Sequence, residues 1–299
     1  MCDDETELRW VLTVGQDLVT LAANDEYFVS GCTKGFRVWR AEDGQEVATM
    51  AVEHVQCVAF SKDGKWIAAG TYWGEVMVWD AKTYKQTFTW KTNIVVRGLD
   101  FSPDATRLVV LGDRMATVLN ITTRELALHP LHHEDGVAAK YSPKGDRIAT
   151  ASRNAVRVYD SSDGHLLVEI QVTVASRFNS GLLWCNDHLF VISESKIKQI
   201  DTSTGLDVSE WPITDTDNHS CIAIPKHGEF IAYAANRAVT FWDTTTNTKR
   251  TLRHSRAIRS ITLSPDGRFL AIGGENEKIT IKRLSRITVS TSIVGLWRI

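Results

Sequence analysis

A repeat of about 40 residues constrains this chain more than any other feature of its sequence. Each repeat contains one recurring position at the end of a short alternating apolar run, often a tryptophan, as in "GFRVWR", "VMVWD" and "VTFWD". We call this position the mark of the repeat. Successive marks lie 40 to 42 residues apart, and self-similarity at a fixed period of this length is typical of stacked structural units. The seven marks are Trp39, Trp79, Leu119, Tyr159, Ile200, Trp242 and Lys282.

Two sets of turn signals keep the same period. One set includes "FSKDGKW", "YSPKGDR" and "LSPDGRF", and the other includes "AEDGQE", "AKTYKQ" and "SSDGHL". The segments between them are short, rich in Val, Ile, Phe and Thr, and alternate with period two, which predicts strands. Each repeat is therefore predicted to form four short antiparallel strands. Since one such sheet cannot bury both faces, we predict an all-β fold, a seven-bladed β-propeller of four-stranded antiparallel blades.

The "FSPDG" and "WD" signatures resemble the WD40 repeat family, and the resemblance covers essentially the whole chain. It is strong in units two, four, six and seven and weak in unit five. The resemblance implies one propeller domain spanning residues 1–299. The expected blades are residues 15–50, 51–90, 91–130, 131–170, 171–211, 212–252 and 253–293.

Two segments compete for the outer edge of the last blade. "TELRWV" (Thr6 to Val11) and "TVSTSI" (Thr288 to Ile293) both fall in the register of an outermost strand. We favour the N-terminal segment, residues 6–12, because joining the first and last blades removes an open seam between strand edges.

Composition limits the cellular setting and the partners. The 299 residues carry a formal net charge of -2, so no overall field favours nucleic acid or an anionic membrane. No apolar run approaches the ~20 residues that span a bilayer. The five cysteines are widely spaced, and the acidic start "MCDDETELRW" differs from a signal peptide. We expect an intracellular protein, cytoplasmic or nuclear, without general nucleic-acid binding, a disulfide framework or a zinc knuckle.

The resemblance also implies a polar set of His, Ser or Thr, Asp and Trp in each blade, which this chain does not keep. The His position is filled by His132 and His254 alone, and no repeat combines His, Asp and Trp. Apolar burial must then hold the blades, with Trp39, Trp79 and Trp242 in their cores. The Asp positions, six residues before each mark, hold Thr33, Trp73, Asp113, Arg153, Glu194, Asn236 and Asn276.

Trp73 thus stands where the family places aspartate, on a turn that WD40 proteins commonly present to partners. With Tyr72 it could anchor a partner, since Trp and Tyr dominate binding hot spots. Alternatively it folds down into the space left by the missing polar set. Trp90, expected in the link to blade three, has the same two interpretations.

Arginines form a second candidate site. Arg259 matches Arg97 in register near the expected channel mouth, and Arg153 and Arg256 are predicted on the same face. Paired arginines can hold a carboxylate or phosphate by forked hydrogen bonds. The alternative is that they pair with nearby acids on a solvated surface, where such pairs contribute little.

No catalytic motif was found, and the cluster "HHED", His132 to Asp135, is the only one that resembles a metal site. The leading hypothesis is a non-catalytic scaffold that binds a protein or peptide, as part of a larger complex or a longer chain, and that needs no cofactor. The alternative is a lactonase-like hydrolase or lyase with a site in the central channel, which needs converging carboxylates or histidines. A third is an aromatic cage of Tyr72, Trp73 and Trp90 that binds a modified lysine or another cation.

Overall fold

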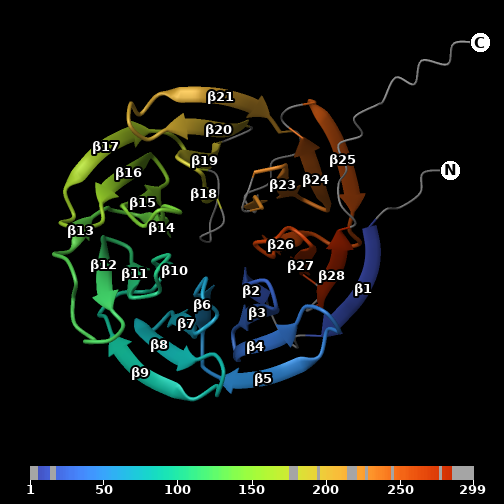
Figure 1. Cartoon of the computed structure of the whole chain (residues 1–299), viewed down its shortest axis with the longest axis horizontal. Helices are drawn as coiled ribbons and strands as arrows, with labels where there is room; N and C mark the ends of the chain where they lie inside the picture. Colours follow the sequence, from blue (N-terminus) through green and yellow to red (C-terminus); the bar gives the residue numbers. More distant parts are fainter. Residues whose placement is uncertain are drawn as a thin grey trace, which may run out of the picture.

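The computed structural model describes residues 6–13, 18–174, 181–193, 196–213, 221–225, 228–243, 246–275 and 278–284. Within these residues the fold is all-β, without a helix, and its strands form seven four-stranded antiparallel sheets around a central axis (Figure 1). The predicted seven-bladed β-propeller is confirmed. No helix in the described part of the chain could cross a membrane.

Blades one to three run from the inner to the outer strand in chain order. Their strands are β2 (Leu18–Ala23), β3 (Tyr27–Cys32), β4 (Gly35–Arg40) and β5 (Glu46–Ala51); β6 (Val55–Phe60), β7 (Trp66–Thr71), β8 (Glu75–Asp80) and β9 (Gln86–Lys91); and β10 (Gly98–Phe101), β11 (Arg107–Leu111), β12 (Met115–Asn120) and β13 (Leu131–His132).

Blades four to six follow the same order. Their strands are β14 (Gly136–Tyr141), β15 (Arg147–Ser152), β16 (Ala155–Asp160) and β17 (Leu166–Gln171); β18 (Leu182–Cys185), β19 (His188–Ser193), β20 (Lys196–Asp201) and β21 (Asp207–Pro212); and β22 (Cys221–Ala223), β23 (Ile231–Ala235), β24 (Ala238–Asp243) and β25 (Thr248–Arg253).

Blade seven joins the two ends of the chain. It contains β26 (Ile258–Leu263), β27 (Phe269–Gly274) and β28 (Lys278–Leu284), and its outer strand is β1 (Thr6–Thr13), antiparallel to β28. The N-terminal segment therefore occupies the last edge, and β1 lies beside β28 in Figure 1. The competing segment Thr288 to Ile293 lies outside the described residues.

The repeated turn signals act through local hydrogen bonds. In blade two, Ser61 Oγ accepts the N–H of Trp66 at 2.9 Å and donates to Asp63 Oδ1 at 2.7 Å, which closes the turn between the first two strands. Asp80 of the "WD" pair accepts the N–H of Thr83 at 2.7 Å and so starts the turn to the outer strand. These bonds need only nearby residues, so each repeat can fold its own hairpins.

Apolar side chains pack between blades. The described residues form seven apolar clusters, and each cluster joins two neighbouring blades, including blades seven and one. Trp39, Trp79 and Trp242 are all buried, as predicted. The ring of Trp79 meets Phe36 of blade one edge-on, with centroids 4.7 Å apart. Burial between blades is therefore what all seven junctions share, while buried polar contacts such as Trp39 Nε1 donating to Ser30 Oγ at 2.8 Å occur in single blades.

Candidate functional site: the link face

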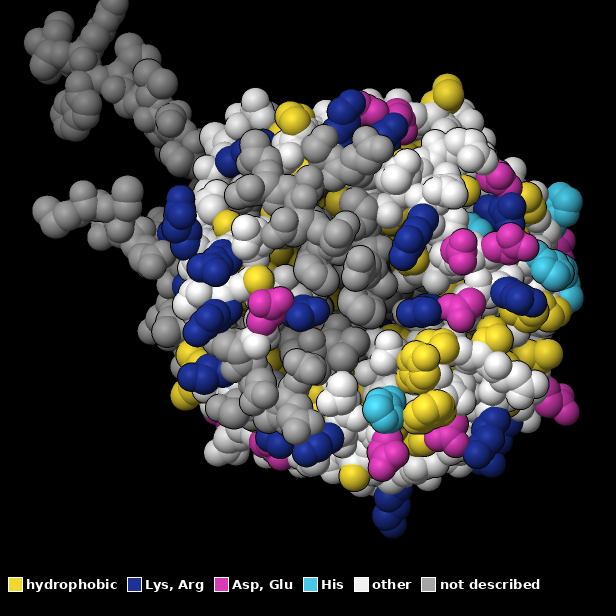
Figure 2. Space-filling model, turned by 180° about the vertical axis from the view of Figure 1, so that it is seen from behind, with side chains coloured by type: hydrophobic (Ala, Val, Ile, Leu, Met, Phe, Trp, Pro, Cys, Tyr) yellow, Lys and Arg dark blue, Asp and Glu magenta, His cyan; other side chains and the backbone are white. Residues whose placement is uncertain are grey.

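One end of the propeller carries both the turns between second and third strands and the links between blades, and we call it the link face. The four strands of a blade are antiparallel, so the second and fourth strands both end at the same end of the propeller. The turn to the third strand and the link to the next blade therefore lie together at that end. Figure 2 shows this face, with apolar side chains and a histidine gathered over blade two. Loops on a rigid frame are common sites of partner binding.

Trp73 lies on the surface of the link face, and 63% of its surface is exposed. Tyr72 is exposed too, and its ring meets Trp73 edge-on with centroids 5.2 Å apart. On the other side His54 meets Trp73 at 5.5 Å, also edge-on. The alternative that Trp73 folds down into the blade is therefore wrong.

The turn that presents these rings is fixed by its backbone. The N–H of Tyr72 donates to the carbonyl of His54 at 2.9 Å, and the buried Thr71 hydroxyl accepts the N–H of Glu75 at 3.0 Å. Gly74 completes the turn at φ +78°, where an added Cβ would lie 2.6 Å from the carbonyl oxygen of Thr92. Only glycine fits there without strain. The two aromatic rings thus stand on a constrained turn.

Trp90 does not join them. It lies on the outer strand β9, opposite Val76 on β8, and not in the link to blade three as expected. Its half-buried ring packs against the apolar cluster between blades two and three. Among the described residues no ring contact joins Trp90 to Tyr72 or Trp73, so the three do not form an aromatic cage.

Arg97 and Arg259, the two arginines expected near the channel mouth, are each paired with an acid of their own blade. Arg97 Nε lies 2.8 Å from Asp113 Oδ1, and Arg259 Nη2 lies 3.1 Å from Glu275 Oε1. Both acids stand on or beside the turn between second and third strands. The alternative of solvated ion pairs therefore holds for Arg97 and Arg259.

Arg153 and Arg256 differ from these two arginines. Both are exposed on the link face, and neither pairs with an acid among the described residues. The remaining Asp positions of the family's polar set include Glu194 and Asn276, which lie outside the described residues.

The structural histidine of blade four is His133, so the prediction of His132 was wrong by one position. His133 is buried, and its Nδ1 lies 2.5 Å from the Thr150 hydroxyl, whereas His132 is exposed. Burial, with a further contribution from Arg157, lowers the pKa of His133 to about 4. Neighbouring residues point to opposite sides of an extended chain, so "HHED" does not direct its histidines to one point. No group of three His, Cys, Asp or Glu side chains in the described ranges could hold a metal.

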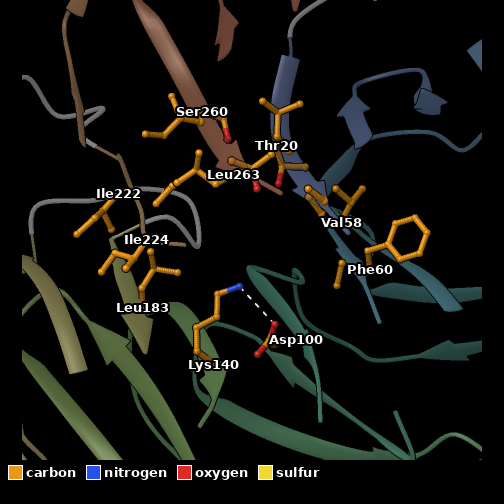
Figure 3. Close-up of a pocket in the computed structure, with 17 residues that line it drawn as sticks. Thr20, Val58, Phe60, Asp100, Lys140, Leu183, Ile222, Ile224, Ser260 and Leu263 are labelled. Atoms are coloured by element: carbon orange, nitrogen blue, oxygen red, sulfur yellow. Dashed lines mark hydrogen bonds and ion pairs between the residues drawn. The ribbon is translucent and has the colours of Figure 1, made fainter. Parts of the chain in front are cut away.

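The central channel encloses a cavity of about 200 Å³. Figure 3 shows Lys140 reaching toward Asp100, with Nζ 3.5 Å from Oδ1. Asp100 Oδ2 also accepts the N–H of Tyr141 at 2.8 Å. Among the described residues that line the cavity, Asp100 is the one carboxylate and Lys140 the one cation, and none is a histidine. The other lining residues are apolar or carry a hydroxyl group. The converging acids or histidines that a hydrolase would need are not found there.

Sequence reasoning missed two features of the site. Asp100 and Lys140 occupy one register position in successive repeats, so the repeat itself could have indicated their contact. Arg237 was also missed. It follows Asn236 at the second-to-third-strand turn of blade six, and the same register could have placed it on the link face.

Comparison with known proteins supports the repeat assignment. Residues 44–80 and 246–281 match the family model described as WD domain, G-beta repeat. The chain is 23% identical to eukaryotic translation initiation factor 3 subunit I of Sclerotinia sclerotiorum, over 90% of this chain and 89% of that protein. It is 28% identical to an uncharacterized WD repeat-containing protein of Deinococcus radiodurans, over 45% of this chain and 60% of that protein. It is 21% identical to the transcriptional corepressor LEUNIG_HOMOLOG of Arabidopsis thaliana, over 84% of this chain and 33% of that protein.

Proposed function

Since the chain is a WD40 repeat protein with a seven-bladed propeller, we propose that it is a non-catalytic scaffold subunit that binds a protein or peptide partner on its link face. The resemblance to a translation initiation factor 3 subunit, over 90% of the chain, supports membership of a multi-subunit assembly of that kind inside the cell. The four described cysteines are buried and unpaired, which is compatible with a reducing compartment. This role needs no cofactor.

The observation that carries the proposal is the exposure of Trp73 on a constrained turn. A large apolar ring in water is unfavourable for an isolated domain, and burying it against a partner recovers that free energy. Because the turn is fixed before binding, little ordering entropy opposes the contact. Tyr72 and Trp73 are thus the proposed anchors, with Trp90 as support from the blade core. The exposed Arg153 and Arg256, and the ion-paired Arg97 and Arg259, are the proposed polar contacts elsewhere on the link face.

Native purification of the tagged chain from its own cells tests the scaffold role. We expect a fixed stoichiometric set of partner subunits, including other subunits of a translation initiation factor 3, measured by quantitative mass spectrometry and size-exclusion chromatography. A chain that elutes alone, without any stoichiometric partner, would contradict the scaffold.

Variants test the choice of surface. Trp73→Ala should weaken partner recovery by about tenfold or more, as expected for loss of an aromatic hot spot. Leu206→Ala is the matched control, because Leu206 is 69% exposed on the turn beside β21 at the opposite end of the propeller. Equal recovery with both variants would show that the partner binds elsewhere.

A further inference from the structure

The turn between the second and third strands of blade six carries a cation and no acid. Asp113 and Glu275 stand at the second-to-third-strand turns of blades three and seven and neutralise Arg97 and Arg259. The corresponding turn of blade six holds Asn236 and Arg237 instead. Arg237 therefore has no acid beside it on its own turn, unlike Arg97 and Arg259, which each have an acid of their own blade within reach.

Two further arginines lie beside Arg237. Arg253, the last residue of β25, pairs with Ala238, the neighbour of Arg237 in the chain. The N–H of His254 donates to the carbonyl of Arg237 at 2.7 Å, and His254 Nδ1 lies 3.1 Å from the carbonyl oxygen of Arg256. These backbone contacts hold Arg237, Arg253 and Arg256 at one corner of the link face, and we call them the blade-six arginine cluster.

All three side chains of the cluster are exposed, and none pairs with an acid in the part of the chain that the structure describes. Glu275, whose N–H donates to the carbonyl of Ala257 beside Arg256, is already engaged by Arg259. Figure 2 shows Lys and Arg side chains in a column over blades six and seven, with few acidic side chains among them. Among the described residues the cluster is thus a concentration of positive charge without an acidic partner, on a protein whose net charge is -2.

We propose that the blade-six arginine cluster binds an acidic segment, a run of Asp or Glu side chains, in the partner that docks on the link face; this rests on the proposed scaffold function. Guanidinium groups bind carboxylates through two parallel hydrogen bonds, which suits a peptide with several acids. Adjacent like charges also attract an oppositely charged segment from a distance and orient it.

Two observations favour an acidic peptide over the phosphates of RNA. Single-stranded nucleic acid is usually held by aromatic side chains that stack on bases as well as by cations. Trp242 of blade six is buried under Lys249, and the aromatic side chains that are exposed among the described residues, Tyr72 and Trp73, stand on blade two. The net charge of the whole chain also provides no broad attraction for nucleic acid.

Fluorescence anisotropy with synthetic probes tests the proposal. The full chain is titrated against fluorescein-labelled octaglutamate, octaglutamine and a uridine decamer, at low and at raised salt. We expect octaglutamate to bind in a salt-sensitive manner and octaglutamine not to bind. The triple variant Arg237→Ala, Arg253→Ala, Arg256→Ala should bind octaglutamate about tenfold more weakly, since three exposed charge contacts are removed.

The control is the triple variant Lys62→Ala, Lys82→Ala, Lys85→Ala, which removes the same charge from exposed turns at the opposite end of the propeller. It should bind octaglutamate like the parent protein. Equal weakening in both triple variants, or binding of the uridine decamer in preference to octaglutamate, would overturn the proposal. Circular dichroism checks that both variants are folded.

The two proposals fail in different ways. The anisotropy assay uses a synthetic probe and does not depend on the natural partner. A normal set of co-purified subunits with no octaglutamate binding would overturn only the acidic-segment assignment. Octaglutamate binding that disappears in the arginine variant, from a chain that purifies alone, would contradict only the scaffold role.

Discussion

At the scale of single residues, His133 shows how burial changes chemistry. Its ring is removed from water between blades three and four, its Nδ1 meets the Thr150 hydroxyl, and its Nε2 has no hydrogen-bond partner among the described residues. A charged imidazolium would lose its hydration there, and the positive charge of Arg157 adds repulsion. The folded protein therefore keeps His133 neutral.

This neutrality predicts acid sensitivity. The pKa of His133 falls from 6.5 to about 4 on folding. Above the upper value His133 is neutral in both states and contributes nothing to pH dependence. Between the two values only the unfolded chain takes up the proton, so stability falls by about 1.4 kcal/mol per pH unit.

Urea unfolding at pH 7 and pH 5 measures the effect. The parent protein should lose about 2 kcal/mol more on acidification than His133→Asn, which has no titrating ring and keeps a polar group for Thr150. Carboxylates titrate alike in both proteins and cancel in the comparison. The same loss in both proteins would show that His133 is not held neutral.

At the scale of elements, one hairpin puts two tryptophans in opposite environments. Trp79 on β8 is buried against Phe36 of the neighbouring blade, whereas Trp73 on the preceding turn faces solvent. On β8, Trp79 lies on the face that packs against blade one, and the Gly74 turn leaves Trp73 in solvent. Local geometry thus separates a residue that stabilises the blade from one that is available to a partner.

Thermal and urea unfolding of two alanine variants checks this separation. Trp79→Ala should cost about 3–5 kcal/mol, because a large core side chain is replaced by a cavity. Trp73→Ala should change the free energy of unfolding by no more than about 0.5 kcal/mol, as for other surface substitutions. A large loss from Trp73→Ala would show that this ring supports the blade instead.

At the scale of the whole molecule, closure of the ring depends on β1. Apolar clusters link each pair of neighbouring blades, and the inner strands β2 and β26 contact each other across the junction of blades one and seven. Trp10 and Leu12 of β1 pack on the cluster shared by these two blades, and Trp10 lies against Gly44 of blade one. The N-terminal strand therefore joins the last blade to the first.

Deletion of residues 1–13 should open this junction. It exposes the edge of β28 and removes the contacts of Trp10 and Leu12, so we expect Tm to fall by roughly 10 °C or more and self-association to increase. Differential scanning calorimetry and size-exclusion chromatography measure the two effects. Deletion of residues 285–299, which leaves all described strands in place, is the control. Equal behaviour of the two deletions would contradict closure by β1.

The sequence by itself determined the number of blades, their order and their turns. Its signals are local: alternation within about six residues, Ser and Asp side chains that close the next turn, and a period that repeats them seven times. Hydrogen bonds of this short range form in any unit with the right residues, so pattern alone can predict them.

Only the tertiary structure decided the character of the candidate site. Whether an arginine is paired depends on an acid on the turn that follows the neighbouring strand, as for Arg259 and Glu275. Whether His133 rather than His132 is buried depends on a one-residue difference in the direction of a side chain. Contacts between distant parts of the chain set these outcomes, because partners far apart in the sequence leave no local pattern to read.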